Sequence, residues 1–322
     1  MTERGGRAAR VCVFGGSGFV GRHLAARLNQ RSTDVVVPTR HLARNRDLRL
    51  LSSVSVTPVE QLDRDEMRVA LRGCDAAVNL VGILNERGHS GAGFHRAHVD
   101  FAENLIAACM SAGVERIVQI SALKANAEHG ASHYLRSKGL AERIVTASGS
   151  KGLRPTILRP SVIFGRDDSF INRFARLLRL SPVLPLARPH ATFAPVYVGD
   201  VVEAIVRVLH DDSTINGTFE LCGPDVYTLL EIVTEIRDVL GIKRAIVPLH
   251  DVLGATQAFL CDYLVPGKPF SLDNFRSLSV PSTCSTNGLA RLGIAPRPFA
   301  TALAELEKRE PQLARLRRAS GR

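Results

Sequence analysis

Tyr134 and Lys138 stand four residues apart in the segment HYLRSKGLAE, so on a helix they share one face. A tyrosine with an unperturbed pKa of about 10 is a poor acid or base at neutral pH. A nearby ammonium would favour the phenolate and lower that pKa. Ser121 ends the apolar run IVQIS and could donate a hydrogen bond to a substrate oxygen that gains negative charge. These three residues predict proton transfer to or from a substrate oxygen, although the YxxxK spacing alone also arises by chance.

A glycine-rich segment near the N-terminus has the spacing GxxGxxG. Gly15, Gly18 and Gly21, with Gly16 added, follow the apolar run ARVCVF and precede the helical pattern HLAARLNQ. Glycines at such a strand-to-helix turn let the backbone approach a pyrophosphate, and the first N–H groups of the helix face the anion. The context predicts a dinucleotide site rather than a turn that is merely tight. The residues expected to hold the pyrophosphate are Gly15, Gly16, Ser17, Gly18, Phe19, Val20 and Gly21.

The end of the second apolar run indicates which dinucleotide is bound. An Asp or Glu at this position would hydrogen-bond the ribose 2′-hydroxyl of NAD. The segment reads VVVPTR, with Thr39 and Arg40 where that acid would stand. An arginine suits a 2′-phosphate, and Arg44 or Arg46 could support it. We therefore expect NADP(H) to be favoured and NAD(H) to be the alternative, unless Arg40 only stacks on the adenine or lies in solvent.

The elements that must position these residues alternate between strands and helices. Short apolar runs predict strands at 9–14, 35–37, 54–59, 76–81, 116–120 and 155–158. Helical patterns lie between them at about 64–71, 93–112 and 132–148. This alternation predicts an α/β fold with a doubly wound parallel sheet, the Rossmann fold. The continuous apolarity of the strands fits burial on both faces.

The second half of the chain has a different texture, because prolines cluster after Pro160 and the periodic signals become irregular. Asp200 is a candidate N-cap for a helix over 201–210, and 228–240 reads as a capped amphipathic helix that ends at Gly241. The expected organisation is a basic arm at 1–8, a nucleotide-binding domain at 9–165, a smaller C-terminal domain at 166–310 that receives a substrate or partner, and a basic tail at 311–322. Residues 192–212 are expected to return to the first domain.

Composition and charge narrow the classes of function. The net charge is +11, but residues 51–310 are neutral on balance, so no long basic stripe follows a nucleic-acid backbone, and we expect no nucleic-acid partner. The sequence has no run of roughly 18 to 20 apolar residues, and we expect no signal peptide. The six cysteines are scattered, without a CxxC pair. These features favour a reducing, cytoplasmic compartment.

Taken together, GGSGFVG, the SAL strand end and YLRSK resemble the short-chain dehydrogenase/reductases. Within that superfamily the chain is most similar to the atypical, epimerase/dehydratase-like branch that contains the nucleotide-binding accessory subunit of respiratory complex I and its bacterial relatives. The resemblance extends over residues 11 to about 295. The segments that carry it are GGSGFVGRHLAARL, VVVPTR, DAAVNLVGIL, ISALKA with SHYLRSKGLAE, LRPSVIFGRDDSFINRFARLL, APVYVGDV and DNFRSLSVPS.

The resemblance implies roles for further residues. Leu80, Val81 and Gly82 would line the nicotinamide-ribose side, Pro160 and Ser161 would border the nicotinamide, and Tyr134 with Lys138 would match the family's catalytic pair. Two positions depart from the family pattern. The acid that usually lies near the adenine is replaced by the segment Val59, Glu60, Gln61, and the position that is usually Asn in the extended members is His98. The second departure puts the catalytic proton relay in question.

Three weaker signals remain. His95 with His98, and His129 with His133, have metal-compatible spacings, but no Cys or paired acid completes a site, so no metal is expected. Residues 170–179 predict a basic amphipathic helix that meets a membrane surface or partner, or else lines a substrate cleft. The apolar stretch 252–266 reads as core rather than contact surface.

Two classes of function follow. The first is an NADPH-dependent oxidoreductase, or a nucleotide-sugar epimerase or dehydratase, that uses Ser121, Tyr134 and Lys138. The second is a non-catalytic NADPH-binding accessory subunit of a respiratory NADH:quinone oxidoreductase. The first class predicts a cytoplasmic location, and the second predicts a peripheral position at the inner membrane. The sequence specifies neither the substrate nor the oligomeric state.

Overall fold

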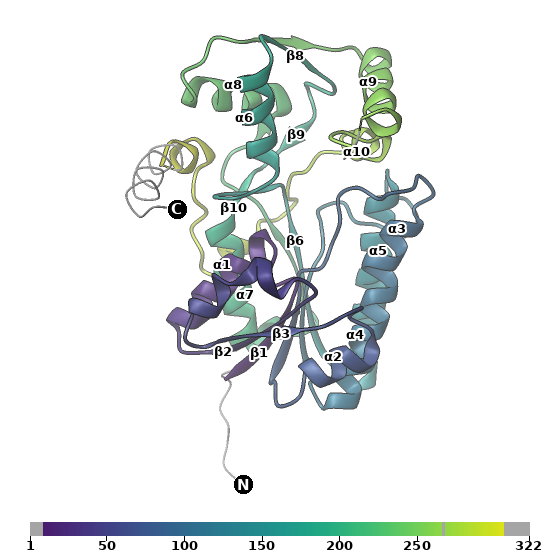
Figure 1. Cartoon of the computed structure of the whole chain (residues 1–322), viewed down its shortest axis with the longest axis vertical. Coiled ribbons are helices and arrows are strands. Elements are labelled where there is room, and N and C mark those ends of the chain that lie inside the picture. The colour runs from purple at the N-terminus through teal and green to yellow at the C-terminus, as the bar shows by residue number, and fades with distance from the viewer. Residues whose placement is uncertain (1–8, 266–267, 306–322) are drawn as a thin grey trace.

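The computed structural model describes residues 9–265 and 268–305, which form two lobes (Figure 1). The predicted basic arm at 1–8 and basic tail at 311–322 lie outside the described residues. A seven-stranded sheet with flanking helices forms the larger lobe. The smaller lobe lies beyond the carboxyl ends of the strands of this sheet (Figure 1).

All neighbouring strands of the large sheet are parallel, which confirms the predicted doubly wound α/β fold. In spatial order the strands are β11 (Thr218–Leu221), β6 (Arg154–Pro160), β5 (Arg116–Ile120), β4 (Ala76–Asn79), β1 (Arg10–Phe14), β2 (Asp34–Thr39) and β3 (Val54–Pro58). The chain moves outward through β2 and β3 and then returns to β4 on the other side of β1. The crevice at the carboxyl ends of β1 and β4 is therefore the place where such sheets bind ligands.

Helices cover both faces of this sheet. One face packs against α1 (Phe19–Gln30) and α7 (Val198–His210), and the other packs against α2 (Arg64–Ala70), α4 (Phe101–Ala112) and α5 (His133–Ala147). The central strands are buried on both sides, as their unbroken apolar runs predicted. The larger lobe thus contains α7, which lies within the 192–212 segment that we expected to return to the first domain. It also contains β11, which lies beyond that segment.

The predicted helix at 93–112 is interrupted. It consists of α3 (Ala92–His95), a π-helical turn (Arg96–Asp100) and α4, which ends at Gly113 with φ +72°. The π turn is the segment that carries His98. Extra turns of this kind are frequent at functional sites in helices.

The smaller lobe is built from short elements around a main apolar core and a smaller apolar cluster of Ala187, Ala258 and Phe275. Its helices are α6 (Phe170–Leu180), α8 (Leu229–Val239), α9 (Asp251–Tyr263) and α10 (Leu272–Ser277), and α11 (Gly288–Arg291) contacts β11 of the large sheet. Three two-stranded sheets complete it: β7 (Ile163–Phe164) with β10 (Val196–Tyr197), β9 (Thr192–Phe193) with β12 (Tyr227–Thr228), and β8 (Val183–Leu186) with β13 (Ala245–Pro248).

Two helices predicted in this half are present, but the start of one of them differs from the prediction. Helix α8 begins at a capping box made by Thr228 and Glu231, and Gly241 follows its end with φ +66°. Helix α7 begins at Val198, so the predicted N-cap role of Asp200 is wrong. Asp200 lies in the first turn instead, where its carboxylate accepts a hydrogen bond from the backbone N–H of Arg297.

The basic amphipathic helix predicted at 170–179 corresponds to α6. Its apolar side is occupied within the chain, because Ile171, Ala175 and Leu178 are buried in the core of the smaller lobe. On the opposite side the guanidinium of Arg173 donates to the carbonyl of Pro269 at 2.6 Å. A partner or a membrane could therefore meet only the arginine-bearing side of α6.

The prediction that the stretch 252–266 belongs to the core is wrong. This stretch forms most of α9, of which only Gly254, Ala258 and Asp262 are buried. Hydrophobic composition cannot distinguish a core helix from a surface helix that is apolar on its exposed side.

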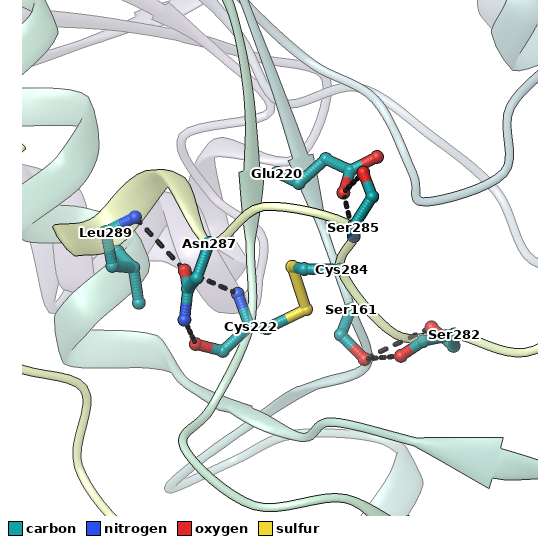
Figure 2. Close-up of a disulfide and its surroundings, with 8 residues drawn as sticks. All are labelled: Ser161, Glu220, Cys222, Ser282, Cys284, Ser285, Asn287 and Leu289. Atoms are coloured by element: carbon teal, nitrogen blue, oxygen red, sulfur yellow. Dashed lines mark hydrogen bonds between the residues drawn. A yellow bond between two sulfur atoms is a disulfide. The ribbon is translucent and has the colours of Figure 1, made fainter. Parts of the chain in front are cut away.

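A disulfide joins Cys222, which follows β11, to Cys284 on the chain that returns from α10 (Figure 2). The same returning segment is held to β6, because the hydroxyl of Ser161 donates to the carbonyl of Ser282 at 2.7 Å. The spacing of the cysteines gave no sign of this pairing, since 62 residues separate the two. Disulfides are rare in reducing compartments. The scattered cysteines therefore no longer support the expectation of a reducing, cytoplasmic compartment.

No helix among residues 9–265 and 268–305 combines the length and the apolar composition that a membrane crossing needs.

Candidate nucleotide-binding and active site

The glycine turn joins β1 to α1 and packs so closely on neighbouring backbone that a Cβ at two of its glycines would collide with it. Gly15 has φ +79°, a conformation that side chains disfavour, and a Cβ there would lie 3.0 Å from the carbonyl carbon of Leu80. A Cβ on Gly21 would lie 2.4 Å from the carbonyl oxygen of Gly15. Gly18 is the N-cap of α1, and the N–H groups of the first helical turn have no carbonyl partner within the helix. The turn therefore fits a pyrophosphate.

Arg22 fixes the position of this turn, and the sequence analysis missed it. Its Nε donates to the carbonyl of Ser17 at 3.0 Å, and its terminal nitrogens contact the side chains of Asn45 and Asp47. The segment after β2 is thereby held against the glycine turn. No local sequence signal indicates this contact, because the partners lie more than twenty residues away from Arg22.

At the end of β2, Thr39 and Arg40 were both predicted to contact the cofactor, but their environments differ. Thr39 is buried, and its hydroxyl accepts hydrogen bonds from the backbone N–H of His41 and the amide of Asn45. Arg40 is exposed and has no ion-pair partner among the described residues. Arg44 is likewise exposed. Thr39 thus shapes the turn, whereas the guanidinium of Arg40 is available to a ligand.

The loop after β3 is shaped by Glu66. The carboxylate of Glu66 accepts hydrogen bonds from the backbone N–H groups of Glu60, Gln61 and Leu62 at 2.8, 3.0 and 2.6 Å. These bonds hold the pKa of Glu66 below its usual range. The side chains of Glu60 and Gln61 are exposed at the outer side of the crevice. Their predicted contact with the adenine end stays a prediction.

The ends of β4 and β5 meet the helix that carries Tyr134 and Lys138. The Lys138 ammonium donates to the carbonyl of Ile120 at 3.2 Å, directly before Ser121. A Cβ on Gly82 would lie 3.1 Å from the Lys138 Nζ. The backbone at Leu80 and Val81 is held by bonds to the carbonyl of Phe14 and to the side chain of Asn79. The structure thus brings the ammonium of Lys138 to Gly82 and to the residue before Ser121.

Burial determines the protonation of this cluster. It raises the pKa of Tyr134 to about 12 and lowers that of Lys138 to about 8, although the charge of Glu142 acts against the second shift. In the free protein, burial therefore raises the pKa of Tyr134 in place of the net lowering expected from Lys138. The hydroxyl of Ser121 is buried and has no hydrogen-bond partner among the described residues. Such an orphaned donor at the end of a central strand is suited to a substrate oxygen.

His98 links the loop after β4 to the helix that carries Tyr134. Its Nε2 accepts a hydrogen bond from the backbone N–H of Ile83 at 3.2 Å, which places the ring proton on Nδ1, 2.8 Å from the Ser137 hydroxyl. That hydroxyl in turn donates to the carbonyl of Tyr134. Burial and the nearby charge of Lys138 lower the pKa of His98 to about 2. Because both ring nitrogens are engaged, His98 has none to offer a water relay in this arrangement.

Asp273, on α10 of the smaller lobe, caps the helix that carries Tyr134. Its carboxylate oxygens accept hydrogen bonds from the backbone N–H groups of His133 and Tyr134 at 2.7 and 3.1 Å. Ser132 caps the same helix end through the N–H of Leu135. Asp273 lies in the family segment DNFRSLSVPS, but no local pattern indicates its capping role, because 139 residues separate it from Tyr134.

Pro160 and Ser161 lie at the end of β6. Pro160 is buried, and its carbonyl accepts a hydrogen bond from the N–H of Leu123. The Ser161 hydroxyl is directed at Ser282, next to the disulfide (Figure 2). These two residues therefore support the wall of the crevice through the returning segment, and the predicted contact with the nicotinamide stays a prediction.

Comparison with known proteins assigns the family. Residues 11–222 match the model of the family described as "NAD dependent epimerase/dehydratase family". The chain belongs to this family. Its glycine turn and its Tyr134–Lys138 pair lie within the matched residues.

The relatives of the chain within known proteins are diverse. It is 31% identical over 292 residues to NADH dehydrogenase (ubiquinone) 1 alpha subcomplex subunit 9, mitochondrial, from Arabidopsis thaliana, covering 86% of this chain and 71% of that protein. It is 29% identical to a ceramide reductase from Caulobacter vibrioides, covering 75% and 74%. Among solved structures, the UDP-glucose 4-epimerase of Thermus thermophilus in complex with NAD shares the fold, with a TM-score of 0.72, 22% identity and coverage of 93% and 98%.

Proposed function

We propose that the protein is an NADPH-dependent oxidoreductase that reduces a carbonyl compound with Ser121, Tyr134 and Lys138. The observation that supports this most is the buried ammonium of Lys138, which contacts the carbonyl of Ile120 directly before Ser121, on the helix that also carries Tyr134. A buried ammonium and an orphaned buried hydroxyl are costly to keep unless they serve a ligand. The similarity to a ceramide reductase supports the reduction of a carbonyl group.

The cofactor site uses the residues of the crevice. The backbone from Gly15 to Gly21 would hold the pyrophosphate, and Arg40 the 2′-phosphate of the adenosine end. Glu60 and Gln61 would lie beside the adenine. Leu80, Val81 and Gly82 would line the nicotinamide ribose, and Pro160 and Ser161 the nicotinamide. When bound, the nucleotide supplies the hydride.

The residues of this chain have separate tasks in the proposed reaction. The Ser121 hydroxyl donates a hydrogen bond to the substrate oxygen. The phenol of Tyr134, with its pKa of about 12, is protonated at neutral pH and gives its proton to that oxygen as the carbonyl carbon gains the hydride. The ammonium of Lys138 stabilises the phenolate that remains. The product is an alcohol, and a proton from solvent restores Tyr134.

A second candidate is a non-catalytic accessory subunit of a respiratory NADH:quinone oxidoreductase. The similarity that favours it extends over 86% of this chain. In that case the nucleotide would be a structural ligand, and Tyr134 would serve packing alone. The nucleotide-sugar epimerase alternative draws on solved structures with no more than 22% identity, which show the fold alone.

The Tyr134→Phe variant tests the proposal. Because phenylalanine keeps the ring packing against Phe94 and His98 but has no proton to give, we expect NADPH oxidation with carbonyl substrates to fall at least about a hundredfold while NADPH binding is retained. Tyr227→Phe, in the smaller lobe, is the matched control and should leave the rate unchanged. An equal rate in the Tyr134→Phe variant and the unaltered protein would refute the catalytic role.

A further inference from the structure

Helix α10 lies on the side of the smaller lobe that faces α5 of the larger lobe (Figure 1). The hydroxyl of its N-cap, Ser271, donates a hydrogen bond to Oδ1 of Asn85 at 3.1 Å. The amide of Asn274 donates to the carbonyl of Leu84 at 3.0 Å. Both partners belong to the loop after β4. One group of α10 side chains therefore holds this loop.

A second group of α10 side chains holds the start of α5. Asp273 and Ser277 stand four residues apart and therefore share one face of α10. The carboxylate oxygens of Asp273 accept the backbone N–H groups of His133 and Tyr134 at 2.7 and 3.1 Å. The hydroxyl of Ser277 donates to that of Ser132, the N-cap of α5, at 2.8 Å. Two N–H groups that have no carbonyl partner within α5 are thus satisfied from the other lobe.

Helix α10 is in turn fixed to the rest of the smaller lobe. The side chain of Phe275 is buried in a cluster with Ala258 of α9. The guanidinium of Arg188 lies over the ring of Phe275, 4.3 Å from its centroid. The backbone N–H of Leu272 donates to the carboxylate of Asp262 on α9 at 3.1 Å. The position of α10 relative to α5 therefore depends on the packing of the smaller lobe.

The phenol of Tyr134 is held by its backbone and by ring contacts alone. Its ring makes edge contacts with those of Phe94 and His98, with centroids 6.0 and 5.7 Å away. The hydrogen bonds that Tyr134 makes within residues 9–265 and 268–305 use its backbone, and none uses its hydroxyl. The place of the hydroxyl is therefore set by the backbone that Asp273 holds.

We infer that Asp273 is a positioning residue for Tyr134. The inference rests on the proposed function, in which the phenol of Tyr134 gives its proton to the substrate oxygen. The carboxylate of Asp273 keeps the phenol where that transfer takes place, and it does so from the smaller lobe. A donor must lie within hydrogen-bond reach of its acceptor, and a misplacement of about 1 Å can cost roughly a hundredfold in rate. Loss of the carboxylate should therefore slow the proton transfer and leave NADPH binding at the glycine turn nearly unchanged.

The position of the Tyr134 ring tests the inference without a substrate. The chain has four tyrosines, so NMR of the full chain labelled with ¹³C-tyrosine gives a simple spectrum, in which the Tyr134→Phe variant identifies one signal. We expect Asp273→Ala to move this signal by more than its line width, because the ring moves relative to its two aromatic neighbours. The matched control is Glu231→Ala, which removes a carboxylate that accepts the backbone N–H of Thr228 at the start of α8. This control should leave the signal in place.

The rate of carbonyl reduction gives a second measurement. Asp273→Ala should lower the turnover number at least about tenfold and keep the KM for NADPH within about twofold. Asp273→Asn should give an intermediate rate, because its amide oxygen can still accept one of the two N–H groups. Urea midpoints, compared with that of Glu231→Ala, show whether each variant is folded. If Asp273→Ala does not fold, Asp273→Asn serves for both measurements.

Three results would overturn the inference. The first is a Tyr134 signal that stays in place in the Asp273→Ala variant, and the second is an unchanged turnover number of this variant while Tyr134→Phe is inactive. The third is a raised KM for the carbonyl substrate at an unchanged turnover number, since Asp273 would then bind the substrate. Equal rates of Tyr134→Phe and the unaltered protein would refute the proposed function instead, and the tyrosine signal alone would then decide whether Asp273 positions Tyr134.

Discussion

Burial shifts the pKa values of the two proposed proton-handling groups in opposite directions. Tyr134 is raised to about 12, so its phenol keeps its proton throughout the physiological range. The pKa of Lys138 is lowered to about 8, so its amine is protonated below that pH and loses its proton as the pH rises through that value. At the residue scale, the site is therefore prepared to act as an acid toward a carbonyl oxygen rather than as a base toward an alcohol.

This distribution of charge predicts the pH dependence of reduction. Because the ammonium of Lys138 stabilises the phenolate, the turnover number for carbonyl reduction should be constant below about pH 8 and fall about tenfold per pH unit above it. The profile is measured from pH 6 to 10 under saturating NADPH, with circular dichroism as the control for folding. A rate that remains constant across this whole range would show that Lys138 plays no such part.

The proposed preference for NADPH rests on Arg40 at the same scale. Losing a charge-assisted contact of about 1.5 to 3 kcal/mol should weaken NADPH binding in the Arg40→Ala variant roughly ten- to hundredfold, with little effect on NADH. Calorimetric titration with both nucleotides measures this difference. Arg49→Ala removes an exposed neighbouring cation and serves as the control. Equal weakening for both nucleotides would assign Arg40 to the adenine rather than to the phosphate.

Single residues could be predicted from the sequence only where their chemistry shows in local spacing. Tyr134 and Lys138 were found because they lie four apart on one helix, and the glycine turn because it lies between a strand and a helix. Arg22 and Asp273 were missed because each acts through a contact that only the tertiary fold creates. The effect of Lys138 on Tyr134 was misjudged because sequence gives no measure of burial.

At the scale of elements, the first half of the chain was predictable because its strands are buried on both faces and its helices have clear ends. The second half was not, since several of its strands have only two residues and the pair β8 and β13 is joined across a long connection. Helix α9 was misassigned because an apolar run indicates burial only when something covers it. The π turn near His98 leaves no periodic signal that distinguishes it from an ordinary helix.

The disulfide ties the segment after α10 to the end of β11, and this connection should contribute to stability. In the chain-entropy view, a link across 62 residues restricts the unfolded chain by about 4 kcal/mol. The Cys284→Ser variant should therefore unfold at a clearly lower urea concentration. Cys261→Ser, which removes a free and partly exposed cysteine, is the matched control. Equal midpoints for the two variants would show that the bond is not formed in solution.

At the scale of the whole molecule, the two lobes are joined beside the loop after β4 and the helix end that carries Tyr134. The amide of Asn85, in the loop after β4, donates to the carbonyl of Lys268, and Ser271 donates to the side chain of Asn85. The amide of Asn274 bonds the carbonyl of Leu84. The smaller lobe thus holds both the loop beyond Gly82 and, through Asp273, the helix end at Tyr134.

The exchange of bound nucleotide tests the central claim most directly. The purified protein is loaded with NADPH, its stoichiometry is determined, and labelled NADPH is added to follow replacement over time. The account predicts about one NADPH per chain that exchanges within seconds, as a cofactor that cycles between redox states must. Exchange over hours, or a protein that retains no nicotinamide dinucleotide, would contradict it, and slow exchange would identify a structural ligand of an accessory subunit instead.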